Sequence, residues 1–326
     1  MVNVIVDGRS DCSNGHKCEK DCFMDESKFQ ELLSWSPDGW SHDTPGPGIP
    51  TDTLFDTFNI GGSEWVDGPC AANTSLVCAK EFASDPMAFT NQSDWVGWAK
   101  LQVSMGVSNL EAAAKNASRF LRSPVMPKFV LTIPYPDPGT RCDNTPGTPG
   151  QILPPPWGAI GGRQLNFTVP ADRLLACTWW IDLVMEEVER LDLLHASLIG
   201  FYWLAEHMER ARFNSNWDPE LVRGVAAHIH SKRKIFMWIP YYHATGWESW
   251  RELGFDFITM QPNWAFCNES CADVSAAERF AQLEADTKQH TMGIEMVRTL
   301  AADPHAWLYR LLCVVKDCSS YYRTTE

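Results

Sequence analysis

Seven short apolar runs, separated by segments with helical patterning, most constrain what this chain can fold into. They are VNVIVD (2–7), TLFDTFNI (53–60), KFVLTIPY (128–135), SLIGFYWL (197–204), KIFMWIPYY (234–242), FDFITMQP (255–262) and TMGIEMV (291–297). Near-continuous hydrophobicity of this kind is typical of strands that are buried on both faces of a parallel sheet. The intervening segments predict helices over 94–103, 108–122, 171–192, 218–231, 246–253 and 275–289.

The alternation of strands and helices predicts an α/β fold, most simply a (β/α)8 TIM-type barrel, with a doubly wound open sheet as the alternative. A chain of 326 residues has room for such a barrel as one domain spanning 1–326. Residues 306–315 (AWLYRLLCVV) are either the eighth strand or a closing helix, so the barrel is expected to be irregular or incomplete there. The Pro/Gly-rich stretches 43–50 and 134–162 predict long loops on the binding face.

Charge and hydropathy argue against two classes of partner. The net charge is −14 and the longest basic run is Lys232–Lys234, which argues against a nucleic-acid or anionic-membrane surface. No apolar stretch reaches the roughly 18 residues that a membrane helix needs. We expect neither kind of partner, and we expect a monomer.

Cysteines and glycosylation sequons indicate an oxidising, secretory route. Eleven cysteines, several of them clustered in polar loops, predict loops stapled by disulfides. The odd number leaves at least one thiol outside an intrachain bridge, and Cys177 is expected to be a core residue of a helix. Five Asn-x-Ser/Thr sequons, at Asn73, Asn91, Asn116, Asn166 and Asn268, agree with a secreted eukaryotic glycoprotein. Met1 leads straight into VNVIVDG, so we expect that a signal peptide is absent from this chain.

Polar and aromatic residues gather where the predicted strands end. In a parallel α/β barrel the carboxyl ends of the strands converge on one mouth. The candidates at this mouth are Asp7, Asn59, Tyr135, Asp137, Tyr202, Trp203, Glu206, Tyr241, Tyr242, His243, Gln261, Asn263, Trp264 and Glu295. Amides and acids hydrogen-bond sugar hydroxyls, and aromatic rings stack on the C–H faces of sugars. The mixture therefore indicates a carbohydrate site.

Two glutamates of this group form a candidate catalytic pair. Glycosidic cleavage needs two carboxyl groups on opposite sides of the scissile bond, and Glu206 and Glu295 end the fourth and seventh predicted strands. The plainer interpretation of Glu206 is an acid in the first turn of a helix. Glu295 lies inside the apolar stretch MGIEMV, where a buried charge without a function is costly.

Other functional motifs are weak or absent. His228 and His230 lie near the end of a predicted helix and are interpreted as helix-end cations. The sequence holds no HExxH, GxSxG, P-loop or GxGxxG motif, so neither a metal nor another cofactor is predicted.

Five motifs follow one another along the chain. They are IPYPDP (133–138), GFYWLAE (200–206), WIPYY (238–242), GWESWRELGFDFITMQPNWAF (246–266) and MGIEM (292–296). Together they resemble domain-of-unknown-function family 4855, a bacterial family found largely in polysaccharide-degrading gut bacteria. The resemblance spans about residues 128–297 and implies a glycoside-hydrolase-like barrel.

The resemblance also implies roles for individual residues. Glu206 and Glu295 stand at the two motif glutamates of the family. Its other polar and aromatic motif positions correspond to Tyr135, Asp137, Tyr202, Trp203, Tyr241, Gln261 and Asn263. The clustered cysteines and the sequons depart from the bacterial pattern, and segments 61–127 and 139–170 do not align, so the substrate stays open.

The leading hypothesis is a secreted glycoside hydrolase that cleaves a poly- or oligosaccharide, with Glu206 as general acid/base and Glu295 as nucleophile or base. One alternative is a non-catalytic carbohydrate-binding barrel. Another is a metal-dependent hydrolase with a metal at Asp7, Asp137 and a histidine such as His243. The acidic net charge would also suit a cationic amino-sugar polymer.

Overall fold

The computed structural model describes residues 3–6, 25–33, 55–61, 90–119, 121, 124–136, 138, 156–208, 217–262 and 276–295. The chain divides into two compact units. Unit 1 comprises Met1–Trp238 and Thr245–Phe257, and unit 2 comprises Ile239–Ala244 and Ile258–Glu326.

Unit 1 is built on a curled sheet of parallel strands in the order β1-β2-β3-β6-β7. The strands are β1 (Asn3–Val6), β2 (Thr57–Ile60), β3 (Lys128–Ile133), β6 (Ser197–Trp203) and β7 (Ile235–Trp238). Burial is nearly continuous along β2, β3 and β7, as expected for a sheet that is covered on both faces. The first five predicted strands are therefore confirmed.

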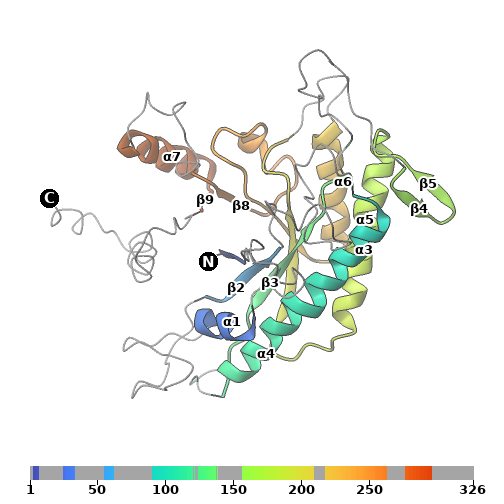
Figure 1. Cartoon of the computed structure of the whole chain (residues 1–326). Helices are drawn as coiled ribbons and strands as arrows, with labels where there is room; N and C mark the ends of the chain where they lie inside the picture. Colours follow the sequence, from blue (N-terminus) through green and yellow to red (C-terminus); the bar gives the residue numbers. More distant parts are fainter. Residues whose placement is uncertain are drawn as a thin grey trace, which may run out of the picture. The chain divides into compact units, whose positions relative to one another are not determined.

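The helices of unit 1 connect successive strands, and α3, α5 and α6 pack beside one another (Figure 1). They are α1 (Glu26–Leu33), α3 (Gln92–Leu101), α4 (Ser108–Ala117), α5 (Pro170–Glu189) and α6 (Trp217–Ser231). Trp95 and Trp180 are fully buried between them, and the Trp180 Nε1–H donates to the Trp95 carbonyl at 2.9 Å. The predicted helices over 94–103, 108–122, 171–192 and 218–231 are confirmed, whereas α1 was not predicted.

A π-helical segment, η4 (Gln102–Val107), joins α3 to α4. Such segments are rare and often accompany functional positions. This one buries Gln102, whose amide donates to the Thr132 carbonyl at 2.9 Å and accepts from the Thr132 N–H at 3.0 Å. The ladder between β2 and β3 ends at the pair Ile60–Leu131, so Gln102 satisfies the next backbone groups of β3.

A β-bulge interrupts the pairing of β3 with β6. The pairing passes from Phe129–Leu198 to Val130–Gly200, so Ile199 has no partner in β3. Because a bulge shifts the alternation of side chains by one residue, it decides on which faces Tyr202 and Trp203 lie. Gly200 is required here, since a Cβ would come within 2.2 Å of the Ile235 carbonyl oxygen.

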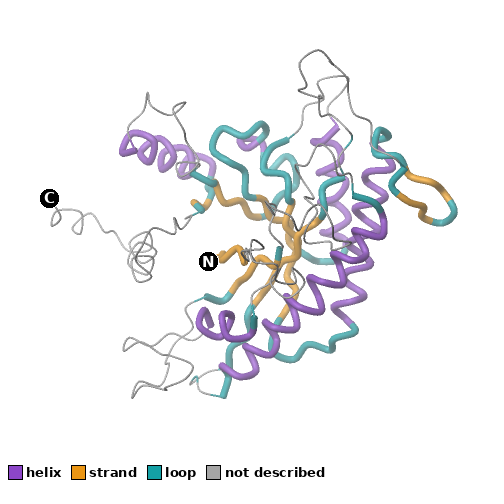
Figure 2. The backbone as a smooth tube through the Cα atoms, in the orientation of Figure 1, coloured by secondary structure: helices purple, strands orange, loops and turns teal. Residues whose placement is uncertain are grey.

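Two predictions about local structure were wrong. The predicted loop 134–162 runs into an antiparallel hairpin of β4 (Gly158–Ile160) and β5 (Arg163–Leu165), which projects beyond the helices in Figure 2. Gly161 and Gly162, with φ of 59° and 81°, form its turn. The predicted helix 246–253 holds only a short 3-10 helix, η5 (Trp247–Ser249). Gly246 and Gly254, with φ of 90° and 91°, flank this segment, and positive φ is incompatible with continuing a right-handed helix.

Unit 2 contains the remaining described strands and one helix. Thr259 and Met260 of β8 (Phe257–Met260) pair in parallel with β9 (Gly293–Ile294), and α7 (Ala276–His290) connects the two strands. The last two predicted strands and the predicted helix 275–289 are confirmed. Residues 306–315, predicted to be an eighth strand or a closing helix, lie outside the described residues.

Candidate functional site

In unit 1, the predicted site residues lie at or just beyond the carboxyl ends of β3 and β6. Tyr135 follows β3, Tyr202 and Trp203 end β6, and Glu206 lies in a bend three residues later. Tyr135, Tyr202 and Trp203 are buried, whereas Glu206 is half-buried. The aromatic residues at the ends of the two strands therefore belong to the protein interior, whereas the Glu206 carboxylate lies nearer to solvent.

A fully buried ion pair lies beside these strand ends. Arg173 of α5 donates from Nη2 to Asp218 Oδ1 of α6 at 2.8 Å, and both side chains are 0% exposed. Arg173 Nε also donates to the Pro136 carbonyl at 2.7 Å, and the Tyr135 hydroxyl donates to Asp218 Oδ2 at 2.9 Å. The pair thus ties the end of β3 to two helices.

Aromatic packing continues this cluster to β6 and β7. The Tyr135 and Trp203 rings meet edge to face with centroids 5.9 Å apart, and the Trp203 and Phe236 rings do so at 6.2 Å. The Arg173 guanidinium lies over the Tyr135 ring at 5.3 Å from its centroid. We call the group formed by Tyr135, Arg173, Trp203 and Asp218 the carboxyl-end cluster.

Charge inside the carboxyl-end cluster is balanced. Burial acts to lower the pKa of Arg173, but the proximity of Tyr135 and Asp218 raises it, so the guanidinium stays protonated. Burial raises the pKa of the neighbouring Cys177 thiol to about 12. Cys177 is a free, buried cysteine, which confirms its predicted place in the core. A buried thiol with a raised pKa is expected to be unreactive at neutral pH.

The loop that carries Glu206 is held on both sides. The Trp238 Nε1–H donates to the Ala205 carbonyl at 2.7 Å, and the Met208 N–H donates to the Thr245 carbonyl at 2.9 Å. Gly246, with φ of 90°, lies so close to Met208 that a Cβ at this position would come within 2.7 Å of Met208 Cγ. These contacts hold the backbone on either side of Glu206.

In unit 2, Tyr242 is bound to α7. Its hydroxyl donates to Asp286 Oδ2 at 2.8 Å, and the Arg279 guanidinium lies 5.0 Å from its ring centroid. Burial and the Asp286 carboxylate raise the pKa of Tyr242 to about 12, so this phenol stays protonated at neutral pH.

The other unit 2 candidates lie near the ends of β8 and β9. Tyr241 and Gln261 form a parallel bridge, and both are half-buried. Glu295 directly follows β9, is half-buried, and donates its N–H to the Met260 carbonyl at 2.8 Å. Its backbone therefore continues the pairing with β8.

Several predicted residues cannot be placed in this way. Asp7, Asp137, Asn263 and Trp264 lie outside the described residues, as do all cysteines other than Cys177.

Two further candidates are described. Asn59 is buried in β2 and accepts from the Thr132 hydroxyl at 3.3 Å. His243 has a positive φ of 65° and its ring lies 4.0 Å from that of Tyr242.

Sequence reasoning missed Arg173, Asp218 and Trp238 as residues that support the site. A usable signal existed for Arg173. The buried stripe of α5 includes Arg173, Cys177, Trp180 and Val184, so an arginine occupies a helical face that is otherwise apolar. An arginine in that position requires a buried acid as its partner.

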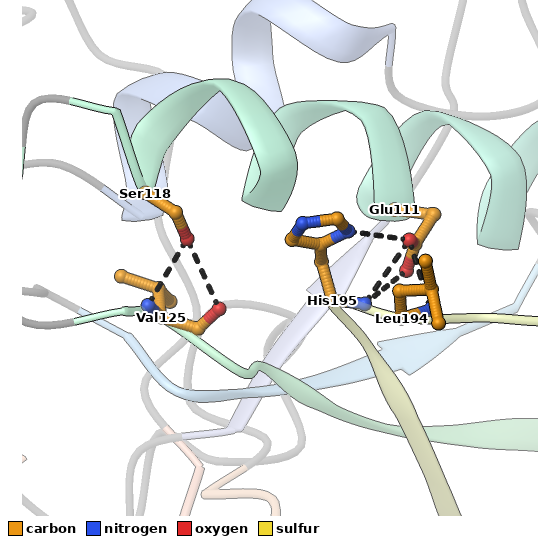
Figure 3. A network of polar contacts seen from close by, with 5 residues as sticks. All are labelled: Glu111, Ser118, Val125, Leu194 and His195. Carbon is orange, nitrogen blue, oxygen red and sulfur yellow. Dashed lines mark hydrogen bonds and ion pairs between the residues drawn. The ribbon is translucent and has the colours of Figure 1, made fainter.

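A second polar group lies at the opposite, amino-terminal end of the sheet (Figure 3). Glu111 of α4 accepts from the Leu194 N–H at 3.1 Å and from the His195 N–H at 2.9 Å, and it lies 2.8 Å from His195 Nδ1. Burial acts to raise the pKa of Glu111, but the bonds from His195 and Leu194 lower it below its ordinary value. Loops at this end of a barrel serve stability rather than chemistry.

Histidines and acids elsewhere form pairs rather than clusters. His228 lies 3.0 Å from Asp182, and His230 lies 2.8 Å from Asp256, each through Nε2. Within the described ranges, no group of three or more His, Cys, Asp or Glu side chains could hold a metal ion. None of the helices described combines the length and the apolar character needed to cross a bilayer.

Comparison with known proteins identifies a family. Neither the curated proteins nor the solved structures gave a match. The family described as domain of unknown function (DUF4855) matches residues 46–313, which is most of the chain and extends beyond the five sequence motifs on both sides. The carboxyl-end cluster and both candidate glutamates fall inside the match, and this protein belongs to the DUF4855 family.

Proposed function

We propose that this protein is a secreted glycoside hydrolase with a (β/α)8 TIM-type barrel that is irregular or incomplete at its last strand, and that it cleaves glycosidic bonds in a poly- or oligosaccharide. Glu206 acts as general acid/base and Glu295 as nucleophile or base. The observation that carries this proposal is the position of Glu206. It is a half-buried carboxylate beyond the carboxyl end of a central parallel strand, on a loop that is bonded on both sides.

The surroundings of Glu206 suit a catalytic carboxyl group. General acid/base catalysis requires the carboxyl to be held within hydrogen-bond reach of the glycosidic oxygen. The bonds at Ala205 and Met208 restrain the loop, and the carboxyl-end cluster stiffens the strand ends beside it. The sugar would be bound by half-buried polar and aromatic groups such as Tyr241 and Gln261.

The proposal is tested with single substitutions in the purified full chain. Glu206→Gln and Glu295→Gln are assayed for product release on a panel of neutral, acidic and cationic glycans. Each is expected to lower kcat/KM by about 10²–10⁴-fold, the usual contribution of a positioned acid or base. Glu186→Gln and Glu284→Gln are the matched controls, since both replace exposed helical glutamates, and they are expected to leave the rate unchanged.

Two outcomes would contradict the proposal. One is hydrolysis at the wild-type rate in both Glu206→Gln and Glu295→Gln. The other is glycan binding without any product from the wild-type chain, which would make the protein a carbohydrate-binding barrel. Where products form, the anomer that is released first distinguishes a retaining from an inverting reaction. A retaining reaction implies carboxyl groups about 5 Å apart, and an inverting reaction implies a separation of roughly 6.5–9.5 Å.

A further inference from the structure

Three of the five sequons fall within the described residues, and two of them share one local geometry. Asn91 precedes α3, and its Oδ1 accepts from the Ser93 N–H at 2.9 Å and from the Ser93 hydroxyl at 2.6 Å. Asn166 lies between β5 and α5, and its Oδ1 accepts from the Thr168 N–H and hydroxyl, both at 2.9 Å. Both asparagines are exposed. Among the described residues, no hydrogen bond engages Nδ2 of either asparagine.

Asn116 is held differently. It lies in α4, is half-buried, and donates from Nδ2 to Glu26 Oε1 of α1. The hydroxyl of its sequon, on Ser118, accepts from the Val125 N–H at 3.2 Å instead of bonding to the asparagine (Figure 3). A glycan on Asn116 Nδ2 would therefore start inside the contact between α4 and α1.

We propose that Asn91 and Asn166 carry N-linked glycans in the folded protein and that Asn116 does not. In the transfer, Nδ2 forms a bond to the anomeric carbon of an oligosaccharide carried on a lipid pyrophosphate. The bond from that carbon to the phosphate oxygen breaks, Nδ2 loses one proton, and the lipid pyrophosphate leaves with the electron pair. The secretory host supplies this donor and the transferase. The inference rests on the secretory route and is independent of hydrolysis.

Both acceptor asparagines border the hairpin β4–β5. Gln92, next to Asn91, exchanges side-chain hydrogen bonds of 3.0 Å with the N–H and the carbonyl of Ala159 in β4. Asn166 directly follows β5. Within the described residues, β4 and β5 pair only with each other, so neither outer edge has a second strand beside it, although Gln92 binds the backbone groups of Ala159 on the edge of β4. Glycans at the two asparagines would flank these edges and hinder their pairing with another chain.

The experiment uses the full chain, secreted from a eukaryotic host behind a cleavable signal peptide. Enzymatic deglycosylation in heavy-oxygen water marks each occupied asparagine, and peptide mass spectrometry reads the marks. Ser93→Ala and Thr168→Ala remove the two sequons while keeping the asparagines, so the Asn91 helix cap survives. Each is expected to remove one glycan from the secreted protein, whereas Asn116→Gln is expected to leave the glycan mass unchanged.

The expected result is marking at Asn91 and Asn166 and none at Asn116. An unmarked Asn166 or Asn91, or a marked Asn116, in secreted protein that unfolds cooperatively would overturn the proposal. Loss of glycan hydrolysis has no bearing on this readout, so the two proposals fail separately. Asn73 and Asn268 lie outside the described residues and do not enter the comparison.

Discussion

The two ends of the unit 1 sheet use polar side chains in different ways. At the amino-terminal end, Glu111 binds the N–H groups of Leu194 and His195, and Lys234 donates to the Leu198 carbonyl at 2.6 Å. These side chains are partly exposed. At the carboxyl-terminal end, Arg173 and Asp218 are fully buried and bind each other and Tyr135.

This difference agrees with the proposed function, which places the chemistry at the carboxyl end of the sheet and leaves the amino end with a structural role. A partly exposed acid at the amino end binds backbone groups that would otherwise face water, so its effect is local. A buried ion pair is a poor way to gain stability, because desolvation offsets most of its attraction. If Glu206 is catalytic, as we propose, the buried pair would serve to position the strand ends beside it.

The largest expected effect is the loss of stability in Arg173→Met. This change leaves the Asp218 carboxylate buried without its cation, and breaking such a pair costs about 3–5 kcal/mol of unfolding free energy. Arg190→Met removes an arginine that pairs with Glu187 at the surface and should cost less than about 1 kcal/mol. Urea titration of both variants measures the contrast.

A double variant sharpens this test. Arg173→Met/Asp218→Asn removes the buried charge but keeps an acceptor for the Tyr135 hydroxyl, so it should recover part of the lost stability. Equal urea midpoints for Arg173→Met and Arg190→Met would show that the carboxyl-end cluster does not hold the strand ends.

Two glycines with nearly equal φ provide the next contrast. Gly246→Ala and Gly254→Ala each impose backbone strain of about 1–3 kcal/mol. A Cβ at Gly254 meets Ala226 Cβ at 2.6 Å, which cannot rotate away, whereas one at Gly246 meets the flexible Met208 side chain. Gly254→Ala should therefore lose more stability, and Gly246→Ala should lose more glycan hydrolysis per folded molecule. A greater loss of hydrolysis per folded molecule in Gly254→Ala than in Gly246→Ala would contradict the proposed role of the Glu206 loop.

A smaller effect is expected in the pH dependence of Glu111→Gln. The folded pKa of Glu111 is lowered, so its contribution to stability is present above the ordinary carboxyl pKa of about 4.3 and is lost as the pH falls through the folded value. The difference in unfolding free energy between wild type and Glu111→Gln should thus be constant near neutrality and shrink in acid. Urea titrations from neutral to acidic pH measure it, with Glu186→Gln as an exposed control. A difference that grows in acid would contradict the assigned bonds.

The smallest effect concerns Cys177. Its buried thiol, with a pKa of about 12, should resist alkylation by iodoacetamide in the native protein at neutral pH and react after denaturation. Mass spectrometry of the peptide that contains Cys177 detects the label. Rapid labelling of the native protein would show that the helix face around Arg173 is open.

Much of the fold could be predicted because strands buried on both faces carry their pattern locally. All seven apolar runs contain strands, since hydrophobicity alone marks them. The hairpin β4–β5 was missed although Gly161-Gly162 between two short runs is a hairpin signal. Segment 246–253 has helical composition, but Gly246 and Gly254 adopt positive φ for reasons of tertiary packing.

The candidate site could be predicted only in outline. Glu206 could be proposed because it lies three residues beyond the end of a strand, and position relative to a strand end can be read along the chain. The partner of Arg173 could not be found in this way, since Asp218 lies 45 residues away and meets it only through the packing of α5 against α6. Burial of Tyr135 and Trp203 likewise depends on neighbours from other elements.

The most direct test of the contrast between the two ends compares Glu206→Gln with Glu111→Gln in one assay, on a glycan that the wild-type chain cleaves. We predict that Glu206→Gln loses about 10²–10⁴-fold in hydrolysis per folded molecule and keeps its urea midpoint, whereas Glu111→Gln loses stability and keeps its rate. Full hydrolysis by folded Glu206→Gln would contradict the account.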